Sequence, residues 1–184
     1  MHLLGLSGSL RASSTNSRLL QATLRLAPPG TTWTIYDGLA DIPAFSPDLD
    51  GADEQVPPPV RRLRELLRAA DAVVVCTPEY AHGLPGALKN LLDWHVGSGE
   101  LVNKPVAAIS AGPGETGGGR AHTSLLTTLA AMNAALPPGA ALIVPFIRER
   151  LSAQGDRADS ITDPTLAQEL RGVLAALHSA LQAR

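Results

Sequence analysis

Short apolar runs alternate with amphipathic segments along the whole chain. The runs at 3–6, 32–36, 72–76, 106–110 and 140–145 have the length of strands. Between them, apolar residues recur at helical spacing, which predicts helices at about 16–27, 60–68, 85–95 and 120–135, and a last one from Asp163 and Pro164 to about 181. Strands that alternate with helices in this way indicate βαβ units and a parallel sheet.

The segments between these elements support the same organisation. Residues 72–76 are uniformly apolar, as expected of a strand buried on both faces of a sheet. Residues 37–59 form a long connection in which Pro57, Pro58 and Pro59 exclude a strand. Five strands and about five helices, without repeats or an internal linker, predict a single domain over 1–184. Its class is α/β, with a doubly wound five-stranded parallel sheet and helices on both faces.

Composition and charge narrow the possible partners. The formal net charge of the 184 residues is −2, and no dense Lys or Arg run suggests nucleic acid. No apolar run approaches the roughly 20 residues that span a bilayer, and no charged segment precedes the first apolar run as in a signal peptide. The only cysteine, Cys76, cannot form an intramolecular disulfide and is expected to be a small core residue. We therefore expect a cytoplasmic protein without a nucleic-acid or membrane partner.

In doubly wound sheets, ligands bind at the carboxyl ends of the strands, where the strand order reverses. For the order 2-1-3-4-5, these are the loops after the first, third and fourth strands. The first loop, 7–17, is crowded with hydroxyl side chains and contains one amide and one cation, Arg11. Such a loop before a helix suits a phosphate, although an ordinary polar loop with a Ser or Asn helix cap remains an alternative. The Gly-Lys-Ser/Thr ending of a Walker A loop is missing.

The second loop, 77–90, follows the most hydrophobic strand. It exposes Glu79, Tyr80 and His82 at the strand tip, between Gly and Pro residues. A planar aromatic ligand could lie against it, with backbone groups fixing the edge of the ring. The alternative is a tight turn with its polar residues in water.

The third loop, 110–120, matches the dinucleotide fingerprint G-x-G-x-x-G at Gly112, Gly114 and Gly117. That interpretation fails because the fingerprint needs an acidic residue roughly 20 positions later, and no Asp or Glu occurs between Glu115 and Glu149. The loop also follows the fourth strand rather than the first. We instead expect the glycines to let the backbone approach a flat ring and to leave the loop mobile.

Together the loops resemble the NADPH-dependent FMN reductase family, which includes flavodoxin-like quinone and chromate reductases. The family's Gly-Ser-Leu-Arg-x-x-Ser-x-Asn motif corresponds to 8–16. Its Pro-Glu-Tyr, Pro-Gly-x-Leu-Lys-Asn and Asp-Trp motifs correspond to 78–80, 85–90 and 93–94. The Gly-rich loop and the segments 36–43 and 47–48 are also similar to the family. The resemblance covers nearly the whole chain and implies bound FMN with NADPH or NADH as electron donor.

The resemblance also implies positions for the flavin. The FMN phosphate would be held by Ser9, Arg11, Ser14, Asn16 and Ser17, and the isoalloxazine would be lined by Pro78, Glu79, Tyr80, Ala81, His82 and Gly83 and closed by Ser110 and Gly112. The family often has Asn and Ser where Ala81 and Gly83 stand. Two polar side chains beside the ring are thereby lost.

The resemblance further implies a ping-pong cycle in which NAD(P)H reduces FMN and the flavin then reduces a quinone, free flavin, chromate or azo compound. No catalytic residue and no metal are assigned. His82 could donate a proton to a quinone, or simply lie in solvent. The helix face around Arg61 to Arg68 is expected to be solvated, with contact to the 2′-phosphate of NADPH as an alternative. Trp94 and Tyr80 could serve the interface of a homodimer or homotetramer. A flavin-binding electron carrier or redox sensor is the alternative to an enzyme.

Overall fold

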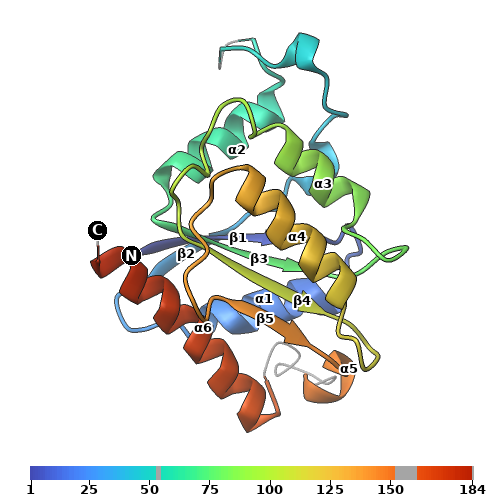
Figure 1. Ribbon diagram of the computed structural model, residues 1–184, viewed down its shortest axis with the longest axis vertical. Coiled ribbons are helices and arrows are strands. Elements are labelled where there is room, and N and C mark those ends of the chain that lie inside the picture. The colour runs from blue at the N-terminus through green and yellow to red at the C-terminus, as the bar shows by residue number, and fades with distance from the viewer. Residues whose placement is uncertain (53–54, 152–160, 184) are drawn as a thin grey trace.

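The computed structural model describes residues 1–52, 55–151 and 161–183 and contains a five-stranded parallel sheet. Its strands are β1 His2–Ser7, β2 Thr32–Ile35, β3 Ala72–Thr77, β4 Val106–Ala111 and β5 Ala141–Val144. They lie in the order β2-β1-β3-β4-β5, with Leu4 beside Val73 in the central register (Figure 1). The predicted flavodoxin-like doubly wound sheet is thus confirmed.

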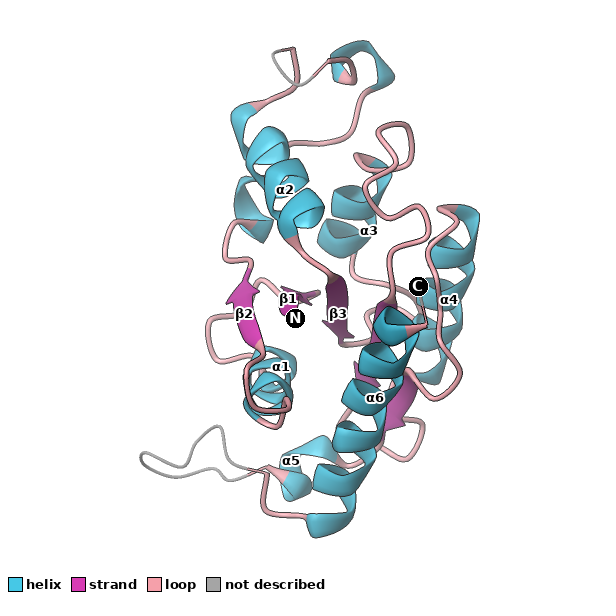
Figure 2. Cartoon of the chain, turned by 90° about the vertical axis from the view of Figure 1, so that its left-hand side faces the viewer, coloured by secondary structure: helices cyan, strands magenta, loops and turns pink. Residues whose placement is uncertain are grey.

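Helices cover both faces of this sheet (Figure 2). One face carries α2 Pro58–Ala69, α3 Gly86–Asp93 and α4 Gly119–Ala131, and the other carries α1 Thr15–Arg25, the short α5 Ile147–Arg150 and α6 Pro164–Gln182. Two 3₁₀ turns, η1 Leu39–Asp41 and η2 Pro47–Leu49, lie in the long connection before α2. Among the described residues, no helix is long and apolar enough to cross a membrane.

The period-two geometry of the strands divides the core into two layers. Val73 and Val75 of β3 pack with α2, α3 and α4, whereas Val74 and Cys76 pack with α1 and α6. Every residue of β3 and β4 is buried, which explains why their sequences are apolar except at Thr77 and Ser110. Cys76 is a core residue as predicted, and burial raises the pKa of its thiol.

Helix ends differ from the expected ones for local reasons. Helix α1 begins at Thr15 because the Ser14 hydroxyl caps it, accepting a hydrogen bond from the backbone N–H of Ser17 at 3.3 Å. Helix α4 ends at Ala131, short of the expected 135, and Asn133 takes a left-handed backbone with φ of 54°. The helix α5 after β5 was not expected, because four residues carry no periodic pattern.

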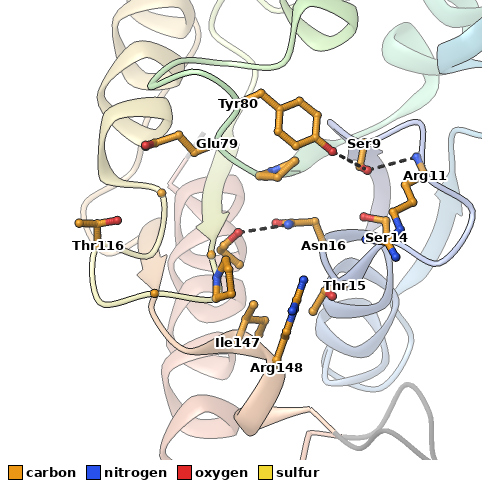
Figure 3. Close-up of a pocket in the computed structure, with 16 residues that line it drawn as sticks. Ser9, Arg11, Ser14, Thr15, Asn16, Glu79, Tyr80, Thr116, Ile147 and Arg148 are labelled. Carbon is orange, nitrogen blue, oxygen red and sulfur yellow. Dashed lines mark hydrogen bonds between the residues drawn. The ribbon is translucent and has the colours of Figure 1, made fainter.

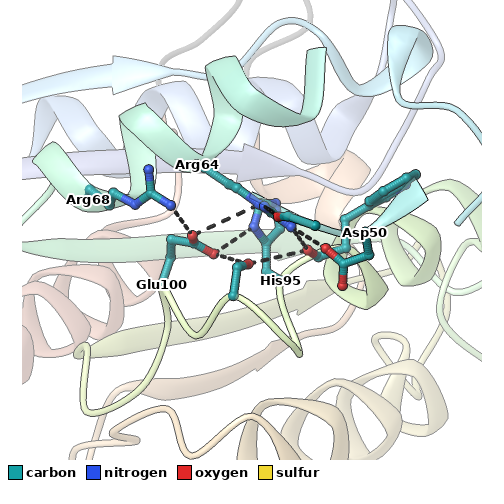
Figure 4. Close-up of polar contacts among 8 residues, drawn as sticks. Asp50, Arg64, Arg68, His95 and Glu100 are labelled. Atoms are coloured by element: carbon teal, nitrogen blue, oxygen red, sulfur yellow. Dashed lines mark hydrogen bonds and ion pairs between the residues drawn. The ribbon is translucent and has the colours of Figure 1, made fainter. Parts of the chain in front are cut away.

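The prediction of a solvated arginine face on α2 is wrong for Arg64. Its side chain is 1% exposed and its guanidinium lies 2.5 Å from the Asp50 carboxylate and 4.0 Å from that of Glu100 (Figure 4). Residue 64 shares a helix face with Val60 and Leu67, so the spacing alone places it inside. Arg62 and Arg68 are exposed as expected, and Arg68 bonds Glu100 at 2.8 Å.

Trp94 is also placed differently from the expectation of an interface residue. It is completely buried, its indole N–H donates to the Pro43 carbonyl at 2.9 Å, and its ring packs edge-on against Phe45. Trp94 therefore fixes the connection before α2 onto α3, and only Tyr80 of the two proposed aromatics is available on the surface.

Candidate active site

A pocket of about 370 Å³ lies at the carboxyl ends of β1, β3 and β4 (Figure 3). All three loops selected from the sequence contribute to its walls. Of the predicted site residues, it is lined by Ser9, Arg11, Ser14, Asn16, Pro78, Glu79, Tyr80 and Gly112. Its remaining lining comes from Thr15, Ala111, Pro113, Gly114, Thr116, Gly118, Ile147 and Arg148.

The other predicted residues lie next to this pocket without lining it. The Ser17 hydroxyl bonds that of Ser7 at 2.7 Å, and the Ser110 hydroxyl is buried in β4 without a hydrogen-bond partner among the described residues. Ala81, His82 and Gly83 form the tip of a turn beyond Tyr80.

The loop after β1 offers several hydrogen-bond donors at one end of the pocket. The Ser14 N–H donates to the Arg11 carbonyl at 3.0 Å, which folds the loop into a turn before α1. The first turn of α1 then presents backbone N–H groups that have no acceptor within the helix. Gly8 allows the loop to lie against β3, because a Cβ there would stand 2.6 Å from the Thr77 hydroxyl. Hydroxyls, N–H groups and the Arg11 guanidinium thus surround a space suited to a phosphate.

Asn16 has a second task in this loop. Its side-chain NH₂ donates to the Ala111 carbonyl at 3.1 Å, and its amide oxygen accepts a hydrogen bond from the Cys76 thiol at 3.4 Å. The residue is 5% exposed. Its amide therefore ties α1 to the tips of β3 and β4 and fixes the relative position of the three loops.

Glu79 connects the second loop with the third. Its Oε2 accepts hydrogen bonds from the backbone N–H groups of Arg120 at 2.9 Å and Ala121 at 3.0 Å, at the start of α4. The N-cap residue Gly118 has no side chain to do this, and Glu79 takes its place. The hydrogen bond from Ala121 is the main cause that lowers the pKa of Glu79, with His82 adding to the effect. The carboxyl group is consequently ionised at neutral pH.

The turn after Tyr80 is tight and left-handed. Tyr80 and Gly83 exchange backbone hydrogen bonds of 3.1 and 3.0 Å across Ala81 and His82, whose φ angles are 49° and 62°. These are the angles of a type I′ turn, which Asn and Gly favour. The His82 side chain is 71% exposed and lies 3.4 Å from the Glu79 carboxylate.

The glycines of the third loop serve mainly the protein's own packing. A Cβ on Gly117 would stand 2.6 Å from the Ile143 side chain, and one on Gly112 would stand 3.2 Å from the backbone of Gly117. Only Gly114 on the pocket wall has open space around its Cβ position among the three fingerprint glycines. Gly112 and Gly117 are thus needed for packing within the protein, and approach of a ring to this loop stays a prediction.

This packing brings a cation into the pocket that the sequence prediction missed. The Ile147 N–H donates to the Gly112 carbonyl at 3.1 Å, which holds α5 against the third loop and directs Ile147 and Arg148 to the pocket. Arg148 follows the carboxyl end of the edge strand β5, outside the three loops that the strand-order rule selects.

The fold and this pocket define a doubly wound α/β protein with a phosphate-accepting loop after its first strand. Residues 1–149 match the family model described as NADPH-dependent FMN reductase. The chain belongs to this family and is an oxidoreductase with FMN and NAD(P)H as its cofactors, as the sequence predicted.

Individual relatives agree with this assignment. The chain is 34% identical over 173 residues to an NAD(P)H-dependent FMN reductase, PA1204, of Pseudomonas aeruginosa, covering 93% of this chain and 92% of the relative. It is 34% identical over 136 residues to a quinone reductase of Escherichia coli, covering 73% and 72% of the two chains. The solved structure of FerB, a flavoenzyme NAD(P)H:(acceptor) oxidoreductase of Paracoccus denitrificans, superposes with a TM-score of 0.80 at 27% identity, over 99% of this chain and 97% of that one.

Proposed function

We propose that FMN binds in this pocket and that the enzyme passes electrons from NAD(P)H to a quinone, free flavin, chromate or azo acceptor. The observation that carries the proposal is the polarity of the pocket. Hydroxyls and the Arg11 guanidinium gather near α1, whereas Pro78 and the ring of Tyr80 line the side that follows β3, with the Tyr80 hydroxyl 3.5 Å from that of Ser9.

The residues that line the pocket fit both the phosphate and the ring of FMN. Ser9, Ser14 and Arg11, with the N–H groups at the start of α1, would bind the phosphate. Pro78 and Tyr80 would flank the ring, and Gly112 and Gly114 leave room at its other side. Asn16 would act chiefly by holding the loops in register, through its bond to Ala111.

When bound, FMN supplies hydride acceptance and electron transfer, and the residues of the chain bind and orient it. Donor and acceptor would occupy the same space over the ring in turn, which gives a ping-pong cycle. Glu79 is ionised and bonded to α4, so it is a poor proton donor to substrate. We assign no catalytic acid or base. Replacing His82 with Ala tests its role, because an unchanged rate of quinone reduction would exclude proton donation by His82.

The proposal includes one domain per chain, a cytoplasmic location and a homodimer or homotetramer. Exposed Tyr80 on the pocket rim, and exposed Phe45, Leu49 and Val96 near α3, support burial against a second copy. Light scattering at micromolar concentration checks the assembly, and a monomer would contradict it.

Steady-state kinetics test the proposed reaction. With NADPH varied at several fixed concentrations of a benzoquinone, a ping-pong enzyme gives parallel lines in double-reciprocal plots. Intersecting lines would show that both substrates bind together and would contradict the shared space above the ring.

A further inference from the structure

A second cavity of about 340 Å³ adjoins the flavin pocket at its phosphate end. It is lined by Arg11, Ser13, Thr15, Arg18, Arg148 and Leu151. Arg11, Thr15 and Arg148 line both cavities, so the two spaces lie side by side. Ser13 and Arg18 line only the second.

The second cavity is strongly cationic. Of the six lining residues in the part of the chain that the structure describes, three are arginines, two carry hydroxyls and none is acidic. Arg11 comes from the loop after β1 and Arg148 from α5, so two distant segments converge on the same space. Within the described parts of the chain, neither the Arg11 nor the Arg148 side chain takes part in an ion pair. The cavity is therefore built to receive an anion with several oxygen atoms.

The substrates of the reaction differ in where they carry negative charge. FMN has one phosphate, for which the hydroxyls and N–H groups between Ser9 and Asn16 already provide donors. The electron acceptors react at the ring, at the other end of the pocket. The reduced dinucleotide carries a diphosphate one ribose away from its reacting ring and, in NADPH, a 2′-phosphate beyond the second ribose.

We propose that the second cavity is the subsite for a phosphate of the reduced nicotinamide dinucleotide. Arg148 and Arg18 bind the phosphate oxygens, with the Ser13 hydroxyl as a further donor. The dinucleotide then runs along the pocket from the ring toward α5. This assignment rests on the proposed function, because it uses NAD(P)H as donor. It replaces the face around Arg61 to Arg68 as the candidate for contact with the 2′-phosphate.

Calorimetric titration of the FMN-loaded protein tests the subsite without any hydride transfer. The probes are adenosine 2′,5′-bisphosphate, which carries the 2′-phosphate, and ADP, which carries the diphosphate. The variants are Arg148→Gln and Arg18→Gln. The control is Arg171→Gln on the exposed side of α6, which removes the same charge outside the cavity. FMN binding to each apoprotein is measured in parallel by flavin fluorescence.

We expect at least one probe to bind the wild-type protein, and the probe that binds identifies the phosphate. Arg148→Gln and Arg18→Gln should weaken its binding about tenfold or more, the loss that follows from one charge-assisted hydrogen bond. Arg171→Gln should not change it, and Arg18→Gln should leave FMN affinity within about twofold.

Three results would overturn the subsite: neither probe binds, Arg148→Gln binds the probes as the wild type does, or Arg148→Gln weakens FMN and not the probes. The last would assign Arg148 to the flavin phosphate. If the probes bind as expected but NADPH and NADH fail to reduce the flavin, the proposed function fails and the phosphate subsite stands.

Discussion

The carboxylate of Glu79 accepts a hydrogen bond from the backbone N–H of Ala121 at 3.0 Å, across 42 positions of sequence. Glu79 follows β3 and Ala121 lies in the first turn of α4, so one ion connects two walls of the pocket at the carboxyl ends of the strands. The positive end of α4 is thereby neutralised from within the protein and is not available to a ligand.

Replacing Glu79 with Gln should destabilise the protein by about 1 kcal/mol at pH 7, the usual value of a helix cap. Because the folded state lowers the pKa of Glu79, its ionised form stabilises the fold above the unfolded value near 4.5. The difference in the free energy of unfolding between variant and wild type should disappear as the pH falls through the lowered pKa. Urea unfolding at several pH values from 7 to 3 measures this difference. Glu115→Gln, on the exposed part of the Gly-rich loop, is the control, and an equal loss there would contradict the cap.

Loss of the buried Arg64 should destabilise the protein far more than loss of its exposed neighbour Arg68. Burial raises the pKa of Glu100, but hydrogen bonds from His95 and Ser98 outweigh it and bring the pKa to about 2. Arg64→Met removes a buried countercharge and should cost about 3–5 kcal/mol. Arg68→Met removes a half-exposed partner of the same carboxylate and should cost at most about 1 kcal/mol. Equal losses in urea unfolding would contradict the burial of Arg64.

Ala81 lies in a left-handed conformation that costs a non-glycine residue roughly 1 kcal/mol. Ala81→Asn and Ala81→Gly should therefore raise the free energy of unfolding by about 0.5–1 kcal/mol, because both residues suit a type I′ turn. Ala12→Gly, in an exposed loop without a positive φ, should be neutral or destabilising. Thermal unfolding of the three variants decides between turn strain and a general effect of loop substitution.

Replacement by Ala should disrupt one glycine position of the third loop and leave another unaffected. Gly117→Ala would place a Cβ 2.6 Å from Ile143 and 2.8 Å from the Pro145 backbone nitrogen, at a φ of 57°. It should displace α5 and weaken FMN binding at least tenfold. Gly114→Ala meets no atom within 4 Å and should fold normally. FMN fluorescence quenching measures both, and an unaffected Gly117→Ala would refute the packing of the loop against β5.

Most of the fold was accessible from sequence because the apolar runs and helical stripes are regular. The sheet order and the three site loops follow from that pattern and from strand topology. The positions that were missed depend on partners distant along the chain. Arg64 is polar by type, and only Asp50 and Glu100, brought together by folding, make its burial possible.

The same limit applies within the site. Glu79 was selected as a residue of the pocket, but its hydrogen bonds to α4 depend on the register of β3 and β4. The glycines of the third loop matched a ligand-binding pattern, whereas Gly112 and Gly117 are required by backbone packing. Arg148 belongs to a helix of four residues that no periodicity could reveal.

The visible absorption spectrum of the purified protein, before and after anaerobic addition of NADPH or NADH, tests the central claim most directly. We predict the absorption of bound flavin, and bleaching of that absorption by at least one of the two donors. A protein that is colourless and cannot be reconstituted with FMN would contradict the assignment of the pocket. A flavin spectrum that neither donor bleaches would contradict the proposed reaction.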